Sequence, residues 1–554
     1  MPSPPEDESG DPGLAECLRL LEAVPAAAAS CPAFRRHWPS ISASLAALSD
    51  SLTSHAVPPA SPLLAPLAAA LRALLSVSAA GDAPRLGHLH TVSLLSSTAA
   101  TLSQLAADAR LLAAPATSGA DHGSAADLLV SRLRLGSAAS RAAALDELAS
   151  AAPSLPGPSA AAAVSAVAEL LDSAGGGGGG GGDLRERAVA ALAALACSDA
   201  ARPALAQEAG AVVPHLCRAL ESGSSSGAEH ACAALLPLTA ASRDAAAAVA
   251  ARGGVAALLA ACAGGTPAAQ AAAAGVLRNL AAFPDLRPAL RDEGALPMLV
   301  QLVSLGTPRA RELALGCLQS LTAGDDDGDE EGQRLKVEAF QAGALGCVRD
   351  FLDGSRGDEA GLAPALGLLR NMASFRYIAE IAAASGGFAA HVAAALGSDR
   401  SATRTEAALA LAELFGNAGG VKAGRHQHEA VAADCVPRLV WMMEAKAAAE
   451  RDAAARALAA LLAASGGCRR AFRKDERGVV NAVQLLDPGA RAVDRRFPVS
   501  VLLAVAPSRR CRKQMVAAGA CGFLQGLVAA EVEGAKRLAE WLGKGKMLGV
   551  FPRT

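Results

Sequence analysis

A glycine recurs through most of this 554-residue chain at intervals in the forties. The successive gaps are 44, 40, 49, 44, 47, 44 and 41 residues. A period of this length, with two or three helical stretches per unit, is typical of an α-solenoid that binds partners along an extended surface. The period predicts the architecture without identifying a partner. The positions are Gly210, Gly254, Gly294, Gly343, Gly387, Gly478 and Gly519, with Asp434 where the series would place another glycine.

The composition favours an all-α fold. Hydrophobic residues make up 52% of the chain but aromatic residues only 3%, and alanine supplies most of the difference. Alanine is the best helix former, whereas strands favour β-branched and aromatic residues. Because alanine buries little apolar area, we expect stability to accumulate from neighbour to neighbour along the stack.

Each repeat is predicted to contain two short helices, before and after the glycine, and a longer third helix. In one copy these span 286–291, 295–303 and 309–322. Thr307-Pro308 opens the third helix, and Thr266-Pro267 opens the equivalent helix of the preceding copy. Threonine at the N-cap followed by proline at the first helical position is the expected start signal.

The repeat divides the chain into segments with different expected structures. The start is acidic and rich in proline, and the region after it has helical apolar spacing without the repeat period. Two segments inside the repeat region, Gly175–Gly182 and Asp325–Glu331, are expected to be a flexible loop and an acidic loop. We expect a disordered N-terminus at 1–12, a helical bundle at 13–114, a linker at 115–125, the solenoid at 126–530, and a C-terminal helix and tail at 531–554.

Charge is unevenly distributed. Residues 446–554 hold 20 Lys and Arg against 9 Asp and Glu, although the whole chain has a net charge of −2. Such a surface fits an acidic peptide, a nucleic acid or an anionic membrane, or it is simply a solvated helix face. The scarcity of aromatic residues that would stack on bases disfavours nucleic acid. The clustered basic residues are Arg469, Arg470, Arg473, Lys474, Arg509, Arg510, Arg512 and Lys513.

Patterns for catalysis, metal binding and targeting are weak or missing. The histidine pairs at 88 and 90 and at 426 and 428 have no further ligands nearby, and we expect no metal, cofactor or enzymatic activity. Twelve scattered cysteines without a C-x-x-C pair indicate a reducing compartment. The start differs from a signal peptide, and no stretch has the apolar density of a membrane span. We expect a soluble protein of the cytoplasm, the nucleus or both, with no transmembrane segment.

The segment Thr266–Gly306 resembles an armadillo repeat. It reads Thr-Pro-Ala-Ala-Gln-Ala-Ala-Ala-Ala-Gly-Val-Leu-Arg-Asn-Leu-Ala, followed later by Glu-Gly-Ala-Leu-Pro-Met-Leu-Val-Gln-Leu-Val. The likeness is to plant armadillo proteins related to the U-box type and to the vacuole-inheritance armadillo protein. It implies a right-handed armadillo solenoid of about 8–9 repeats. Phe34-Arg35-Arg36-His37-Trp38 and Leu86–Thr91 are similar to the helical domain that precedes the U-box in many plant ligases.

Two departures from the family narrow the function. Only about ten linker residues separate the N-terminal bundle from Leu128, which is too few for a U-box. The import-adaptor subfamily places Trp and, four residues later, Asn along its third helices; here no Trp occupies the Trp position. Third helices line the groove of the family. The resemblance therefore makes Arg278, Asn279, Arg370 and Asn371 the candidate groove residues, with asparagine able to bond a peptide backbone and arginine its carboxylates.

These observations predict a non-enzymatic scaffold that binds partner proteins, including acidic peptide segments, along an armadillo groove. The alternative is a component of the ubiquitin-ligase pathway that lacks a U-box and recruits substrates or regulates a ligase. A nuclear import adaptor is a third and less favoured interpretation. The sequence leaves the partner and the oligomeric state open.

Overall fold

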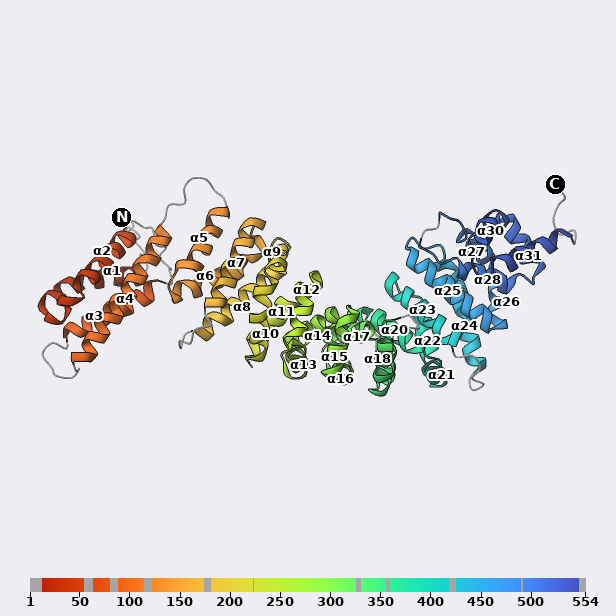
Figure 1. The fold of residues 1–554 in the computed structure, drawn as a ribbon, viewed down its shortest axis with the longest axis horizontal. Coiled ribbons are helices and arrows are strands. Elements are labelled where there is room, and N and C mark those ends of the chain that lie inside the picture. The colour runs from red at the N-terminus through yellow and green to blue at the C-terminus, as the bar shows by residue number, and fades with distance from the viewer. Residues whose placement is uncertain are drawn as a thin grey trace, which may run out of the picture. The chain divides into compact units, whose positions relative to one another are not determined.

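The structure is a computed structural model, and its described part is helical, with no β-strand among the residues described (Figure 1). The chain separates into two compact units, Met1–Ala257 and Leu258–Thr554, which are treated one at a time below. The all-α prediction is therefore confirmed. The described residues are 12–53, 63–79, 88–113, 122–173, 181–222, 224–324, 330–354, 359–385, 387–417, 425–489 and 492–547.

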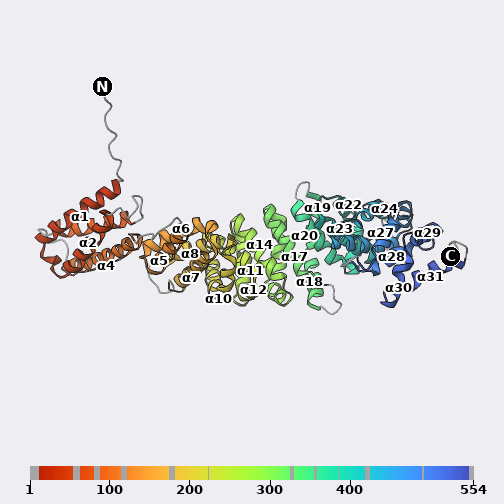
Figure 2. The same cartoon turned by 90° about the horizontal axis from the view of Figure 1, so that it is seen from above.

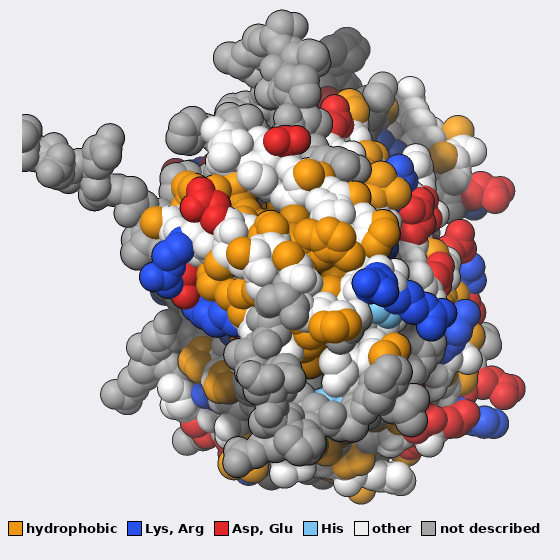
Figure 3. Space-filling view, turned by 90° about the vertical axis from the view of Figure 1, so that its left-hand side faces the viewer, with side chains coloured by type: hydrophobic (Ala, Val, Ile, Leu, Met, Phe, Trp, Pro, Cys, Tyr) orange, Lys and Arg blue, Asp and Glu red, His pale blue; other side chains and the backbone are white. Residues whose placement is uncertain are grey.

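The described part of the first unit begins with four α-helices and one short 3-10 helix around one apolar core. Phe34 is buried in this core and meets the ring of Trp38 edge to face, with 6.4 Å between ring centroids. Leu14, Leu18 and Leu75 are only partly buried against the core. In Figure 3, which turns this end of the chain toward the viewer, apolar side chains gather between charged ones. The helices are α1 (Pro12–Ser30), η1 (Pro32–Arg36), α2 (Trp38–Thr53), α3 (Leu64–Ala79) and α4 (His88–Ala113).

Repeats follow this bundle within the same unit. Three long helices, α6, α8 and α11, act as third helices, and each packs against the next. On the second helices, buried His215 of α10 contacts Asp172 of α7 with 2.8 Å between Nε2 and Oδ1. The helices are α5 (His122–Leu135), α6 (Ala138–Ala151), η3 (Ala152–Ser154), α7 (Gly157–Ser173), α8 (Gly181–Cys197), α9 (Arg202–Gln207), α10 (Ala209–Glu221), α11 (Ser225–Ala241), α12 (Arg243–Ala251) and α13 (Gly254–Gly264), in which the unit boundary falls.

The second unit continues the three-helix pattern. Its third helices are α14 (Pro267–Ala281), α17 (Pro308–Leu321), α20 (Glu359–Ala373), α23 (Ser401–Asn417), α25 (Ala448–Ala464) and α28 (Arg496–Val505). Its first and second helices are α15 (Arg287–Asp292), preceded by η4 (Pro284–Leu286), and α16 (Ala295–Leu305), α18 (Glu330–Gln341), α19 (Ala344–Gly354), α21 (Arg376–Ala384), α22 (Phe388–Ala395), α24 (Arg425–Met442), α26 (Gly466–Lys474), α27 (Gly478–Gln484), α29 (Arg509–Ala517) and α30 (Ala520–Ala529). The last helix, α31 (Ala535–Met547), packs against α28 and α30, as a third helix would (Figure 2).

The predicted start signals of the third helices are present. The Thr266 hydroxyl accepts a hydrogen bond from the Ala269 amide at 3.1 Å, and the Thr307 hydroxyl accepts one from the Ala310 amide at 3.4 Å. Each threonine therefore satisfies one of the free amides at a helix N-terminus.

The recurring glycine has more than one structural role. Gly294, Gly343, Gly387 and Gly519 have positive φ angles of 74–88°, and each directly precedes a second helix. This left-handed conformation is natural for glycine and reverses the chain between two short helices. By contrast, Gly210 lies inside α10, and Asp434 lies inside the unbroken helix α24. The period thus marks the repeats, but only some copies need glycine for the turn.

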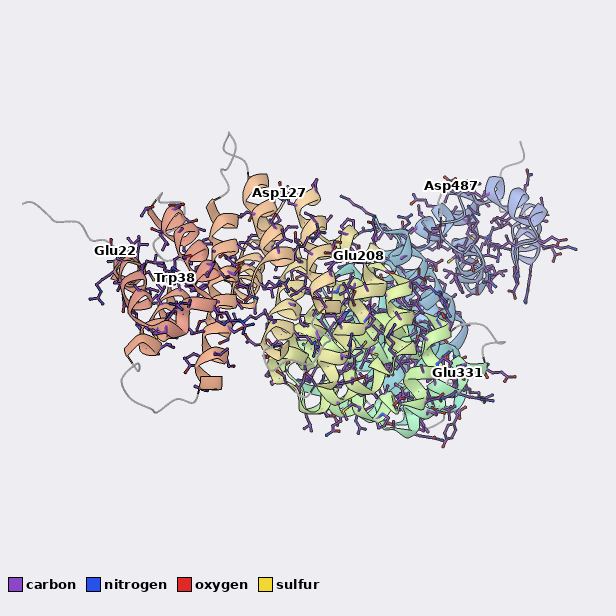
Figure 4. The ribbon with its side chains drawn as sticks, turned by 60° about the vertical axis from the view of Figure 1, so that its left-hand side comes forward. Glu22, Trp38, Asp127, Glu208, Glu331 and Asp487 are labelled. Carbon is purple, nitrogen blue, oxygen red and sulfur yellow. The ribbon has the colours of Figure 1, made fainter. Side chains whose placement is uncertain are left out.

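Several expected loops border helices. Residues 122–125 of the expected linker belong to α5, Gly181–Gly182 begin α8, and Glu330–Glu331 begin α18. Figure 4 labels Glu331, in the first turn of α18. The rest of these loops, the first eleven residues and the tail after Met547 lie outside the described residues.

The cysteines and apolar helices add two findings. All twelve cysteines are free thiols, and nine of them are buried. Burial raises the pKa of the Cys217 thiol to about 11 and that of Cys262 to about 12. No single helix in the described ranges is long and apolar enough to cross a membrane. Two pairs, α12 with α13 and α21 with α22, reach that length only when joined across bends of 86° and 94°.

We predict that Gly343→Ala destabilises the protein by about 1–2 kcal/mol, because an L-residue must adopt a left-handed conformation there. An added Cβ would meet nothing within 4 Å, so this cost is purely conformational. The matched control is Gly210→Ala, which we expect to be neutral or to stabilise by up to about 1 kcal/mol, since Gly210 is helical. Urea unfolding followed by circular dichroism checks both; equal midpoints for the two variants would contradict the assignment.

Candidate functional site

The third helices of the second unit form a continuous row, in which each helix from α14 to α28 packs against the next. We call α14, α17, α20, α23, α25 and α28 the third-helix row. Small residues such as Ala273, Ala274 and Ala314 are fully buried in it, together with leucines such as Leu277 and Leu318. Small side chains let helices approach closely.

Two glycines of the row receive side chains from the preceding repeat. A Cβ on Gly316 would lie 2.9 Å from Cδ of Arg278, and a Cβ on Gly367 would overlap the amide of Gln319. These glycines occupy the position at which the import-adaptor subfamily carries Trp. The missing side chains of Gly316 and Gly367 leave room for Arg278 and Gln319, respectively.

Arg370 and Asn371 are adjacent on α20 but lie in different environments. Asn371 is only 4% exposed, and its Nδ2 donates to the Gln319 carbonyl at 2.9 Å and to the Thr322 hydroxyl at 3.1 Å. Its Oδ1 accepts from Arg370 Nε at 3.1 Å. Asn371 thus ties α20 to α17 and has no amide hydrogen left for a peptide. The sequence predicts that Asn371 donates to a peptide backbone, but its amide hydrogens are used within the fold, where it holds two helices together.

Ion pairs continue from Arg370 along the row. Arg370 Nη1 lies 2.9 Å from Oε2 of Glu406, and Gln319 Nε2 donates to Oε1 of the same carboxylate at 3.2 Å. Burial raises the pKa of Glu406, while Arg370 and Gln319 act in the opposite direction. Further along α23, Oε1 of Glu413 accepts a hydrogen bond from Nη2 of Arg456 of α25 at 2.5 Å. Paired charges therefore link α20, α23 and α25, and the Gln319 amide joins α17 to them.

The row contains a hollow of about 480 Å³ near its C-terminal end. Phe497 of α28 lies at its edge, with the guanidinium carbon of Arg456 5.7 Å and that of Arg496 5.9 Å from the ring centroid. These distances fit cation–π contacts. Arg496 also pairs with Asp494 at 2.6 Å. The remaining lining residues are mostly small or apolar and comprise Ala412, Ala459, Ala460, Ser500, Leu503, Glu533 and Gly534.

The predicted site residues are divided between this row and another part of the unit. Arg278 and Asn279 are partly exposed on α14, and Arg370 is partly exposed on α20. The basic cluster lies instead on the first helices α26 and α29. The sequence interpretation missed Gln319, Glu406 and Phe497. Gln319 lies three residues after Gly316, just as Arg278 and Arg370 each lie three residues after a glycine of the row. This spacing from a glycine could have identified Gln319 in the sequence.

Metal chemistry finds no support in the residues that the structure describes, since no group of three or more His, Cys, Asp or Glu there could hold an ion. The row offers paired charges and a hollow with the Phe497 ring beside it. Such a surface can bind side chains of another molecule and orient them.

Comparisons with known proteins bear on the fold. No protein-family model and no curated protein matches the chain. An engineered protein solved by the Northeast Structural Genomics Consortium is 23% identical, with a TM-score of 0.61, over 76% of this chain and 98% of its own. A designed armadillo repeat protein, and another in complex with the peptide (KR)4, are 18% identical over 45% of this chain and 99% of theirs, with TM-scores of 0.39 and 0.38.

The fold is an armadillo-like α-solenoid. Two short helices around a left-handed glycine, followed by a long helix that packs on its counterpart in the next repeat, confirm the predicted class. Such repeat folds are typically binding scaffolds, because stacking creates extended surfaces.

We predict that Asn371→Ala lowers the free energy of unfolding by roughly 1–3 kcal/mol, since it removes buried hydrogen bonds between α20 and α17. Ser320 holds the equivalent position on α17 and is partly exposed. Ser320→Ala is therefore the control, with an expected change within about 0.5 kcal/mol. Thermal and urea unfolding measure both. A stable Asn371→Ala variant would return this residue to the candidates for partner contact.

Proposed function

We propose that this protein is a non-enzymatic scaffold that binds an extended segment of a partner protein along the third-helix row. The hollow at Phe497 is the observation that carries this proposal. It combines an aromatic ring, two arginines and a lining of small residues on three consecutive third helices. Aromatic residues and arginine are the side chains that most often dominate binding energy at interfaces.

The chemistry of the hollow favours an apolar anchor with a polar neighbour. Ala459 and Ala460 leave room above the helix surface, and the Phe497 ring supplies an apolar wall. The side chains of Arg456 and Arg496 are 37% and 61% exposed. Each arginine is already paired with a carboxylate, so it adds little net charge to the hollow. Its N–H groups can still orient a bound acceptor. A partner carboxylate next to the apolar anchor would share these guanidinium groups.

The remaining partly exposed residues of the row extend this surface toward α14. Arg370 keeps 24% of its side chain exposed while it holds Glu406. Arg278 lies across Gly316 in the same manner as Gln319 lies across Gly367. We propose that Arg278 and Arg370 contact the partner segment beyond its anchor, and that Asn371 supports them from below.

We predict that Ala460→Leu reduces partner binding at least about tenfold, because the larger side chain fills the hollow. Ala460 is partly exposed, so the fold should tolerate leucine. Affinity purification with quantitative mass spectrometry identifies partners of the parent protein, and the variant then measures their dependence on the hollow.

Ala194→Leu is the matched control. Ala194 holds the same repeat position on α8 of the first unit, is also partly exposed, and lines no part of the hollow. We expect it to keep all partners. Retention of every partner by Ala460→Leu at the parental level would reject the hollow as the anchor site.

A second proposed role is in the ubiquitin-ligase pathway, as a substrate-recruiting or regulatory component that lacks a U-box. It rests on the likeness of the segment around Trp38 and on the partly exposed apolar side chains of the α1–α4 bundle. Figure 4 labels Trp38 in this bundle. The bundle would then contact a ligase while the row holds another protein.

We predict no ubiquitin chains when the purified protein is incubated with activating enzyme, conjugating enzymes, ubiquitin and ATP. The expected role is recruitment, so chains should appear only after a ligase partner is added. An authentic U-box ligase serves as the positive control. Robust chain formation by this protein alone would overturn the non-enzymatic proposal.

A further inference from the structure

The basic helices α26 and α29 are the first helices of two consecutive repeats. Each begins after a serine N-cap: Ser465 accepts from the Cys468 amide at 3.2 Å, and Ser508 accepts from the Cys511 amide at 3.5 Å. Helix α27 packs against both of them, so the two basic helices share one neighbour. Neither belongs to the third-helix row.

Two arginines of this region are used inside the fold. Arg469 Nη1 donates to the Leu462 carbonyl at 2.5 Å, at the end of the preceding third helix. Arg512 Nη1 donates to the Ala506 carbonyl at 2.6 Å and lies over the Trp541 ring at 5.7 Å. Both therefore cap the C-terminus of a third helix. Arg473 is exposed and donates to the Arg469 carbonyl of its own helix at 3.1 Å.

The other basic side chains of these helices are exposed and, within the described part of the chain, make no hydrogen bond or ion pair. Their charges are thus available to a ligand. These five residues, which we call the basic face, are Arg470, Lys474, Arg509, Arg510 and Lys513.

The placement of this charge opposes the stability of α29. Arg509 and Arg510 are in its first turn, which contains no acidic residue. Positive charge at a helix N-terminus is repelled by the helix dipole. Other first helices also begin with arginine, but those arginines have partners: Arg202 pairs with Asp199, Arg376 pairs with Glu380, and Arg287 donates to the Ala281 carbonyl. An arrangement that works against the local fold and has no internal partner indicates a binding role.

The chemistry of the basic face selects an acidic protein segment over other polyanions. The largest apolar residues of the two helices, Phe472 and Met515, are fully buried, so neither is available to insert into a membrane or to stack on a base. What remains is a set of long, flexible cations on helix surfaces. Such side chains match spaced carboxylates.

We infer that the basic face binds an acidic segment of a partner protein, separately from the hollow at Phe497. The two surfaces would let one chain hold two partners, or one partner at two points. Because the contact is electrostatic and exposed, its affinity should fall steeply as salt is raised.

The test uses the full chain and a fluorescein-labelled decapeptide of glutamate, with binding followed by fluorescence anisotropy. We expect binding at 50 mM salt that weakens at 200 mM. A variant with Arg470→Gln, Lys474→Gln, Arg509→Gln, Arg510→Gln and Lys513→Gln should bind at least tenfold more weakly. Ala460→Leu should bind the peptide as the parent does, which separates this surface from the hollow.

The control removes the same charge elsewhere, through Arg252→Gln, Arg309→Gln, Arg334→Gln, Arg349→Gln and Arg376→Gln. These arginines are also exposed. We expect the control to bind like the parent. Equal loss in both variants, or no peptide binding at 50 mM salt, would overturn the inference. Tighter binding of phosphatidylserine vesicles or of a ten-nucleotide single strand than of the peptide would also overturn it.

Discussion

Within each unit, the packing of each third helix against the next joins consecutive repeats, and small residues are among those it buries. Ala273 and Ala274 of α14, Ala314 and Cys317 of α17, and their equivalents further along are fully buried. Each such residue contributes little apolar area, so stability comes from the repetition of the contact. The abundance of alanine thus suits this packing as well as helix formation.

Small residues of the third helices also shape the surface of the row. Where the row carries glycine, a long polar side chain from the previous repeat lies across it, as Arg278 does over Gly316. Gln319, which lies over Gly367, also donates to Glu406, and Arg370 pairs with the same carboxylate, so these side chains join neighbouring helices. An aromatic ring at the edge of a hollow, such as Phe497, is consequently a rare feature and a strong candidate for a partner contact.

The fold was largely predictable because a repeat period and helix caps are local signals. Helices α14 and α17 begin at the two threonines that the sequence marks. The site was less predictable, because adjacency in sequence does not determine exposure. Arg370 and Asn371 are neighbours, yet one reaches the surface and the other is buried against Thr322. The hollow at Phe497 joins three helices and Gly534, so no single segment contains its signal.

Charge counting from sequence has a related weakness in solenoids. An arginine near the start of one helix can reach back to the carbonyls that end the preceding one. Arg404 and Arg451 do so, with contacts of 2.8 Å to the carbonyls of Ser398 and Ala445, and Arg469 and Arg512 do the same. This spacing recurs because every repeat ends a helix just before another begins. A basic cluster in such a protein is therefore part cap and part surface. The arginines bonded to helix-ending carbonyls must therefore be subtracted from such a cluster. The basic residues that remain on α26 and α29 are the ones that an acidic partner can contact.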